Sequence, residues 1–127
     1  MIIADTDVLI DFLHGRGEAD RVAFELEHGL ATTVVTAFEL WTGSAGSSKR
    51  EKAVSRLLDA LDIIPLHTAA SKTAADLRYS LQREGRTIGM ADALIAGICI
   101  ESQAILLTRN RKHFESIPRL TLGASSI

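Results

Sequence analysis

Short apolar runs alternate with longer segments of helical periodicity along this chain, and the alternation limits the folds open to it. Runs with the length and composition of buried strands occur at residues 1–4, Ala31–Val35, Ile63–Ile64 and Ala104–Leu107, and Leu120–Leu122 would add an edge strand. Helical patterns begin at Asp7 and Thr36 and span residues 18–28, 49–62, 68–84 and 90–102. Strands that alternate with helices favour an α/β fold with a central, mainly parallel sheet of four to five strands.

Composition and charge place few further limits on the chain. Its 127 residues are enough for one ordinary domain, and no linker or low-complexity segment divides residues 1–127. The formal net charge of −2 carries no signature of nucleic-acid binding. Basic residues nevertheless gather locally, at Arg78, Arg83 and Arg86 and again over residues 109–113, where a solvated face is the simplest interpretation.

The single Cys99 excludes an internal disulfide and a cysteine zinc cluster, and its apolar surroundings predict a buried, inert thiol. The first residues lack the basic region and long apolar run of a signal peptide, and no apolar stretch reaches the ~18 residues of a membrane span. We therefore expect a cytoplasmic protein with no membrane partner.

Three carboxylates follow or precede predicted strands in a way that suggests a shared site. Ligands of open parallel sheets bind outside the carboxyl ends of the strands. Asp5 ends the first strand, Glu39 follows the second, and Asp92 opens the apolar helix before the fourth. A second acid, Asp7, stands two residues after Asp5, and like charges at close range repel and raise pKa values unless a cation neutralises them.

Each acid also has a structural explanation. Asp5 can begin a turn, Glu39 completes a capping box that starts at Thr36, and Asp92 can interact with a helix dipole. We expect Asp7 to cap the first helix close to the site and Asp11, one turn later, to face solvent. No histidine pair has the spacing of metal ligands, and no Ser/His/Asp or Cys/His set indicates a nucleophilic side chain.

Four segments, taken in order, resemble the PIN-domain family. They are Ile3-Ala4-Asp5-Thr6-Asp7, Thr36-Ala37-Phe38-Glu39-Leu40, Gly89-Met90-Ala91-Asp92 followed by Ile95-Ala96, and Thr108-Arg109-Asn110 followed by His113-Phe114. Each motif alone is weak, but together they agree in order and spacing over essentially the whole chain. The similarity is greatest to the VapC-type toxins of prokaryotic toxin–antitoxin pairs.

The resemblance implies a Rossmann-like three-layer sandwich and cleavage of RNA that depends on Mg²⁺ or Mn²⁺. It assigns catalysis and metal binding to Asp5, Glu39 and Asp92, and the fourth metal position, often Asp in the family, is Asn110 here. A neutral Asn leaves one less charge to hold a second cation. The resemblance also implies an antitoxin that blocks the site and a homodimer.

Further residues are predicted to support this site. Thr6 and Thr108 can orient the carboxylates through their hydroxyls, with Asp7 nearby. The candidates for binding RNA phosphates are Arg86, Arg109, Arg111 and Lys112.

Other readings remain open on the sequence. One is a PIN-like module that binds RNA or protein without catalysis, and another is a housekeeping PIN nuclease. A third is a haloacid-dehalogenase-like phosphatase, because the segment Asp5-Thr6-Asp7-Val8-Leu9 partly matches the nucleophile motif of those enzymes. It lacks support from a late acidic pair, because Thr108-Arg109-Asn110-Arg111 follows the fourth strand.

Overall fold

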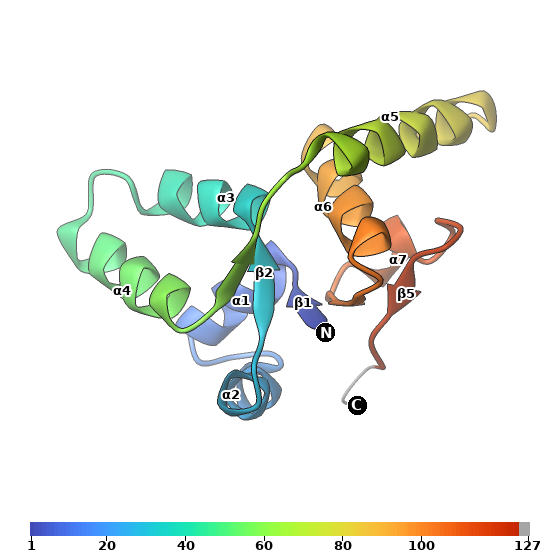
Figure 1. The fold of residues 1–127 in the computed structure, drawn as a ribbon. Helices are drawn as coiled ribbons and strands as arrows, with labels where there is room; N and C mark the ends of the chain where they lie inside the picture. Colours follow the sequence, from blue (N-terminus) through green and yellow to red (C-terminus); the bar gives the residue numbers. More distant parts are fainter. Residues whose placement is uncertain (125–127) are drawn as a thin grey trace.

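Within residues 1–124, which the computed structural model describes, five parallel strands form one sheet in the order β3-β2-β1-β4-β5 (Figure 1). They are β1 (Ile2–Ala4), β2 (Ala31–Thr33), β3 (Asp62–Ile64), β4 (Ile105–Leu107) and β5 (Thr121–Leu122). Ala4 pairs with Thr32 on one side and with Leu107 on the other, so β1 is central. The predicted parallel sheet is confirmed, including its edge strand.

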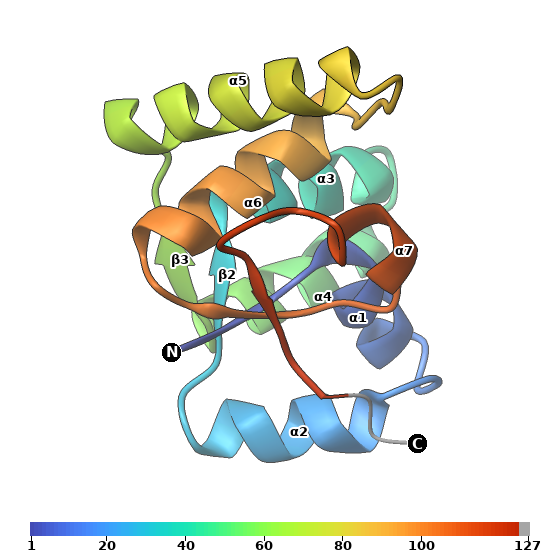
Figure 2. The ribbon, with the colours of Figure 1, turned by 90° about the vertical axis from the view of Figure 1, so that its right-hand side faces the viewer.

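Helices cover both faces of the sheet (Figures 1 and 2). They are α1 (Thr6–Leu13), α2 (Ala19–Glu27), α3 (Val34–Ser44), α4 (Ser48–Asp59), α5 (Thr68–Arg83), α6 (Met90–Glu101) and the single turn α7 (Arg111–Phe114). Side chains alternate across a strand, so Ile3 packs with α5 and α6 whereas Ala4 packs with α1 to α4. The expected three-layer sandwich is confirmed, and no described helix is long and apolar enough to cross a membrane.

Two predicted helix starts are wrong, and each of the two errors concerns residues of the candidate site. The second strand ends at Thr33, not Val35, because the Thr33 hydroxyl accepts a hydrogen bond from the Thr36 backbone N–H at 3.1 Å and begins α3 there. Thr36 and Glu39 therefore form no capping box. The first helix is capped by Asp5, whose Oδ1 accepts from the Thr6 N–H at 2.7 Å, and not by Asp7.

Helix α6 lies at the centre of one layer, as its nearly uniform apolar sequence predicts. Its residues 95–100 are all buried. The closest packing involves Gly97, where a Cβ atom would lie 2.5 Å from the Ala70 carbonyl oxygen and 3.1 Å from the Ala74 Cβ. The missing side chain thus lets α5 approach α6, the helix that carries Asp92.

We expect Gly97→Ala to destabilise the protein by about 1–3 kcal/mol, because the added methyl group must push α5 away from α6. The matched control is Gly43→Ala in α3, where an added Cβ meets nothing within 4 Å. Alanine has the higher helix propensity, so the control is expected to be neutral or stabilising by up to about 1 kcal/mol. Denaturant unfolding of both variants measures the difference, and equal effects would contradict this packing.

Candidate active site

Asp5 lies at the carboxyl end of the central strand and is held by both neighbouring segments. Its Oδ1 accepts from the Thr6 N–H, and its Oδ2 accepts from the Thr108 hydroxyl at 2.8 Å. The Thr108 oxygen in turn accepts from the Asn110 N–H at 3.0 Å. The chain continues from β1 to β2 on one side of it and reaches β4 on the other side later. The hydrogen bond between Asp5 and Thr108 therefore lies at the switch point of the sheet.

The Asp5 carboxyl is buried, with an exposed fraction of 4%, and its pKa rises from 3.8 to about 7. Burial is the main cause, and the negative charges of Asp7 and Asp92 raise the pKa further. The hydrogen bonds from Thr108 and Thr6 oppose this rise. Both acids are therefore close enough to act on Asp5, but desolvation exceeds the like-charge repulsion that the sequence suggested.

Asp7 contributes an oxygen that has no partner. Its Oδ1 accepts from the Arg109 N–H at 3.4 Å, whereas Oδ2 is the one buried side-chain oxygen or nitrogen without a hydrogen bond among residues 1–124. Burial raises the pKa of Asp7 above 3.8, against the effect of that Arg109 N–H. An unsatisfied carboxylate oxygen beside Asp5 is unfavourable unless a donor or a cation meets it.

Glu39 reaches the site through threonine hydroxyls. The Thr6 hydroxyl donates to Glu39 Oε1 at 2.6 Å, and the Thr6 and Thr36 oxygens lie 3.0 Å apart. Since the Thr6 backbone N–H also donates to Asp5, one residue connects two of the predicted acids. The side chain of Glu39 is half-buried in the middle of α3. Its carboxylate bonds across to α1 and not to the start of its own helix.

Asp92 occupies the first turn of α6, and its side chain is 31% exposed. Its Oδ2 lies 3.3 Å from His113 Nδ1 on α7. The helix start at Met90 and the short helix α7 thus bring together residues that are 21 positions apart (Figure 2). Asp92 also acts on Asp5 electrostatically, which places the two acids in one cluster.

The expectation that Asp11 faces solvent is wrong. Asp11 is 2% exposed, and its carboxylate accepts from Arg109 Nη1 at 3.0 and 3.1 Å and from Arg16 Nε at 3.2 Å. A carboxylate four residues after Asp7 would be repelled on an isolated helix, but the two arginines supply the compensating charge. Sequence reasoning missed this contact because 98 residues separate Asp11 from Arg109.

The four basic residues predicted to bind RNA fall into two pairs. Arg109 is engaged by Asp11, and Arg111 donates to the Gly123 carbonyl oxygen. Arg86 and Lys112 instead line a cavity of about 440 Å³ beside Asp92. Asn110 is exposed at the start of α7, where its side chain makes no capping hydrogen bond and its backbone N–H orients Thr108.

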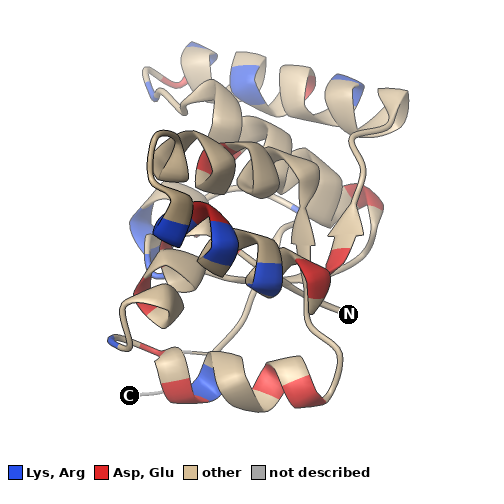
Figure 3. Ribbon diagram, turned by 90° about the vertical axis from the view of Figure 1, so that its left-hand side faces the viewer, with Lys and Arg blue, Asp and Glu red and all other residues tan. Residues whose placement is uncertain are grey.

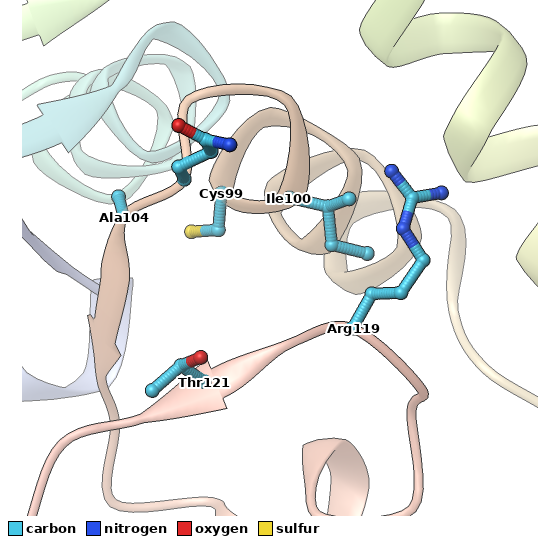
Figure 4. Close-up of a pocket in the computed structure, with 6 residues that line it drawn as sticks. Cys99, Ile100, Ala104, Arg119 and Thr121 are labelled. Carbon is cyan, nitrogen blue, oxygen red and sulfur yellow. The ribbon is translucent and has the colours of Figure 1, made fainter.

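Cys99 is buried towards the end of α6, and the charge of Asp5 reaches it electrostatically. It borders a cavity of about 300 Å³ together with Ala104 and Thr121, at the amino ends of β4 and β5 (Figure 4). Burial raises the pKa of the thiol to about 12, so Cys99 is protonated and a poor nucleophile at neutral pH. The prediction of a buried thiol is confirmed.

The acid cluster suits a hard divalent cation. No three His, Cys, Asp or Glu side chains in residues 1–124 stand ready as a complete ligand set. Mg²⁺ and similar ions, however, need only one or two carboxylates and fill their remaining positions with water and substrate phosphate. Each Asp5 oxygen accepts one hydrogen bond from the protein and keeps a free lone pair, and Asp7 Oδ2 is unpartnered.

Comparison with known proteins agrees with this geometry. The PIN domain family matches residues 2–120. The chain belongs to the PIN domain family. "Ribonuclease VapC2" of Rickettsia felis is 35% identical over 96 residues, which cover 73% of this chain and 72% of that protein.

Two further similarities extend over more of the chain. "tRNA(fMet)-specific endonuclease VapC" of Shigella flexneri is 27% identical over 117 residues, 89% of each chain. A chain of a toxin–antitoxin complex from Klebsiella pneumoniae superposes with a TM-score of 0.77 at 26% identity, covering 95% of this chain and 96% of that one. The matched range, residues 2–120, spans the four segments that carry the predicted motifs.

A Mn²⁺ ion at this acid cluster would be bound more weakly at acidic pH. A cation must displace the proton that Asp5 holds below pH 7, so the apparent affinity should fall about tenfold from pH 8 to pH 6. Titration calorimetry at both pH values measures it. Thr108→Val removes a hydrogen bond that lowers the pKa of Asp5, and should move this pH dependence upward.

The same pKa has a consequence for stability without metal. Folded Asp5 binds its proton more tightly than the unfolded chain, so this group's contribution to the free energy of unfolding is complete below about pH 4 and is lost as pH rises to about 7. Asp5→Asn lacks the titration. Without metal, the melting temperature of this variant relative to the wild type should therefore rise between pH 4 and pH 7, and a constant difference would contradict the buried carboxylate.

We expect Asp11→Asn to lower the free energy of unfolding by about 1–3 kcal/mol, because a buried carboxylate that accepts from two cations is lost. The two arginines are 63% and 61% exposed, which limits the loss. Asp62→Asn, an exposed acid on β3, is the control and should change stability by less than about 0.5 kcal/mol. Urea unfolding compares them, and similar values would sink the assignment.

Proposed function

We propose that this PIN-domain protein is a metal-dependent endoribonuclease that serves as the toxin of a toxin–antitoxin pair. The observation that carries the proposal is the cluster at the carboxyl end of β1, in which Asp5 is coupled electrostatically to Asp7 and Asp92. The ribonuclease names of the relatives from R. felis and S. flexneri support RNA as the substrate. An RNA-cleaving toxin would act in the cytoplasm.

Asp5 and Asp92 are the principal ligands in this proposal, with Glu39 completing the site. When bound, Mg²⁺ or Mn²⁺ would polarise the scissile phosphate and lower the pKa of the attacking water. Asp5 is fixed by Thr6 and Thr108, so its orientation does not depend on the cation. Glu39 is fixed by the Thr6 hydroxyl and is available to orient water.

Asp7 adds charge next to these ligands. Its free Oδ2 would either join the ligand set or accept a hydrogen bond from a water of the cation. The neutral Asn110 does not raise the negative charge of the site, which agrees with a site that binds one cation and recruits a second with the RNA phosphate.

An antitoxin and a second copy of the chain are the expected protein partners. An apolar cavity of about 340 Å³, lined by Ile10, Leu13, Leu40 and Val54, opens beside Glu39 and would receive apolar side chains of an antitoxin segment. On α3, Val34, Phe38 and Trp41 follow helical spacing and are 41%, 69% and 43% exposed. This stripe supports the homodimer that the resemblance implies.

Asp5→Asn and Asp92→Asn are each expected to slow RNA cleavage by at least about 100-fold in Mn²⁺, because each removes a ligand from a cation that supplies several kcal/mol of charge stabilisation. The substrates are a pool of single-stranded RNA and an initiator tRNA transcript. EDTA should abolish cleavage by the wild type.

The control for both variants is Asp20→Asn, an exposed acid at the start of α2. It should cleave at the wild-type rate, and circular dichroism should show the same fold in all three variants. Cleavage that persists in EDTA, or that survives both site substitutions, would reject the proposed mechanism.

A further inference from the structure

The cavity of about 440 Å³ beside Asp92 has features that the acid cluster does not use. The last turns of α5, the loop before α6, the first turn of α6 and helix α7 form its walls. Its volume lies within the range of small-molecule sites, about 300–1,000 Å³. Asp92 and His113 line the cavity, so it adjoins the proposed metal site through the Asp92 carboxylate.

Two cations in this cavity are not neutralised. Arg86 donates one hydrogen bond to the Ser116 hydroxyl, which leaves most of its five N–H groups free. Within residues 1–124, neither Arg86 nor Lys112 has a carboxylate partner, and both are exposed. Among the residues that line the cavity, Asp92 and His113 are the other titratable side chains, and these two contact each other.

The remaining lining suits a nucleotide more than a free anion. Leu81 and Ile88 give an apolar floor, and the hydroxyls of Thr87 and Ser116 can bond to a sugar. Gly89, the N-cap of α6, also lines the cavity and provides no side-chain cap for the helix. The partial positive charge of that helix start adds to the two cations and favours a phosphate.

We propose that this cavity is a subsite for the nucleotide next to the cleaved bond, with Arg86 and Lys112 bound to its phosphate. The inference rests on the proposed ribonuclease function and adds where the RNA strand leaves the metal site. It also separates the basic residues, because Arg109 and Arg111 are held by Asp11 and by the Gly123 carbonyl and do not line this cavity.

The first test measures binding without cleavage. In the Asp5→Asn background, anisotropy of a fluorescein-labelled single-stranded RNA 12-mer gives Kd at several salt concentrations. Arg86→Gln with Lys112→Gln should raise Kd at least tenfold. It should also reduce the slope of log K against log salt by about 0.7, because one phosphate of the single strand is no longer neutralised by the protein.

The control removes the same charge from another side of the molecule. Lys52 and Arg56 lie on α4, a basic helix on the opposite side of the fold from α7 (Figures 1 and 3). Lys52→Gln with Arg56→Gln should change Kd less than twofold. Equal weakening by both double variants would show a general effect of charge and overturn the subsite, as would unchanged binding by the cavity variant.

The second test locates the phosphate on the RNA. A methylphosphonate linkage that neutralises the phosphate next to the cleaved bond should slow wild-type cleavage about tenfold. In Arg86→Gln with Lys112→Gln, the same linkage should slow it less than twofold, because the partners of that phosphate are already absent. Equal slowing in both proteins would overturn the subsite.

The two proposals fail in different ways. If the wild type cleaves no RNA in Mn²⁺, the ribonuclease function is rejected, whereas the binding experiment still tests the cavity. If the wild type cleaves RNA and the cavity variant binds and cleaves like the wild type, the subsite alone is rejected.

Discussion

A carboxylate removed from water needs partners, and Asp5 has them because it stands where three segments of the chain meet. Its own helix provides the Thr6 N–H, and the segment after β4 provides the Thr108 hydroxyl. The Asp5 backbone N–H also bonds the Leu107 carbonyl at 2.8 Å, which continues the pairing of β1 with β4 beyond the strands. The site is therefore anchored where the pairing of the central strand β1 with β4 ends.

The segment from Thr108 to Asn110 links most of the remaining site residues. Thr108 orients Asp5, the Arg109 N–H bonds Asp7, the Arg109 side chain binds Asp11, and the Asn110 N–H holds Thr108. Both ends of α1 are thus tied to one short segment. Asp11 binds the Arg109 side chain, and the Arg109 backbone N–H binds Asp7. Asp11, which takes no part in the chemistry, therefore helps to position the acids.

Charge is divided around Asp92 in a way that suits a polyanion. Negative groups gather at the end of β1, where burial and mutual repulsion keep Asp5 protonated up to about pH 7 without a cation. Free cations stand on the other side of Asp92, in the cavity of Arg86 and Lys112. A cation held by the acids and a phosphate held by the basic residues would attract each other, so that each would favour the binding of the other.

The sequence by itself determined the architecture and the four motifs, because the period of the apolar residues reports which face is buried and the acids follow strand ends. The helix caps were predicted less well. Thr33 caps α3 in place of the predicted Thr36–Glu39 capping box, and Asp5 caps α1 in place of Asp7, because in each case two suitable side chains lie within three residues of each other. Only the tertiary structure decided the partners. The pairing of Asp11 with Arg109, the division of the basic residues and the free oxygen of Asp7 depend on contacts between distant segments, which no local pattern encodes.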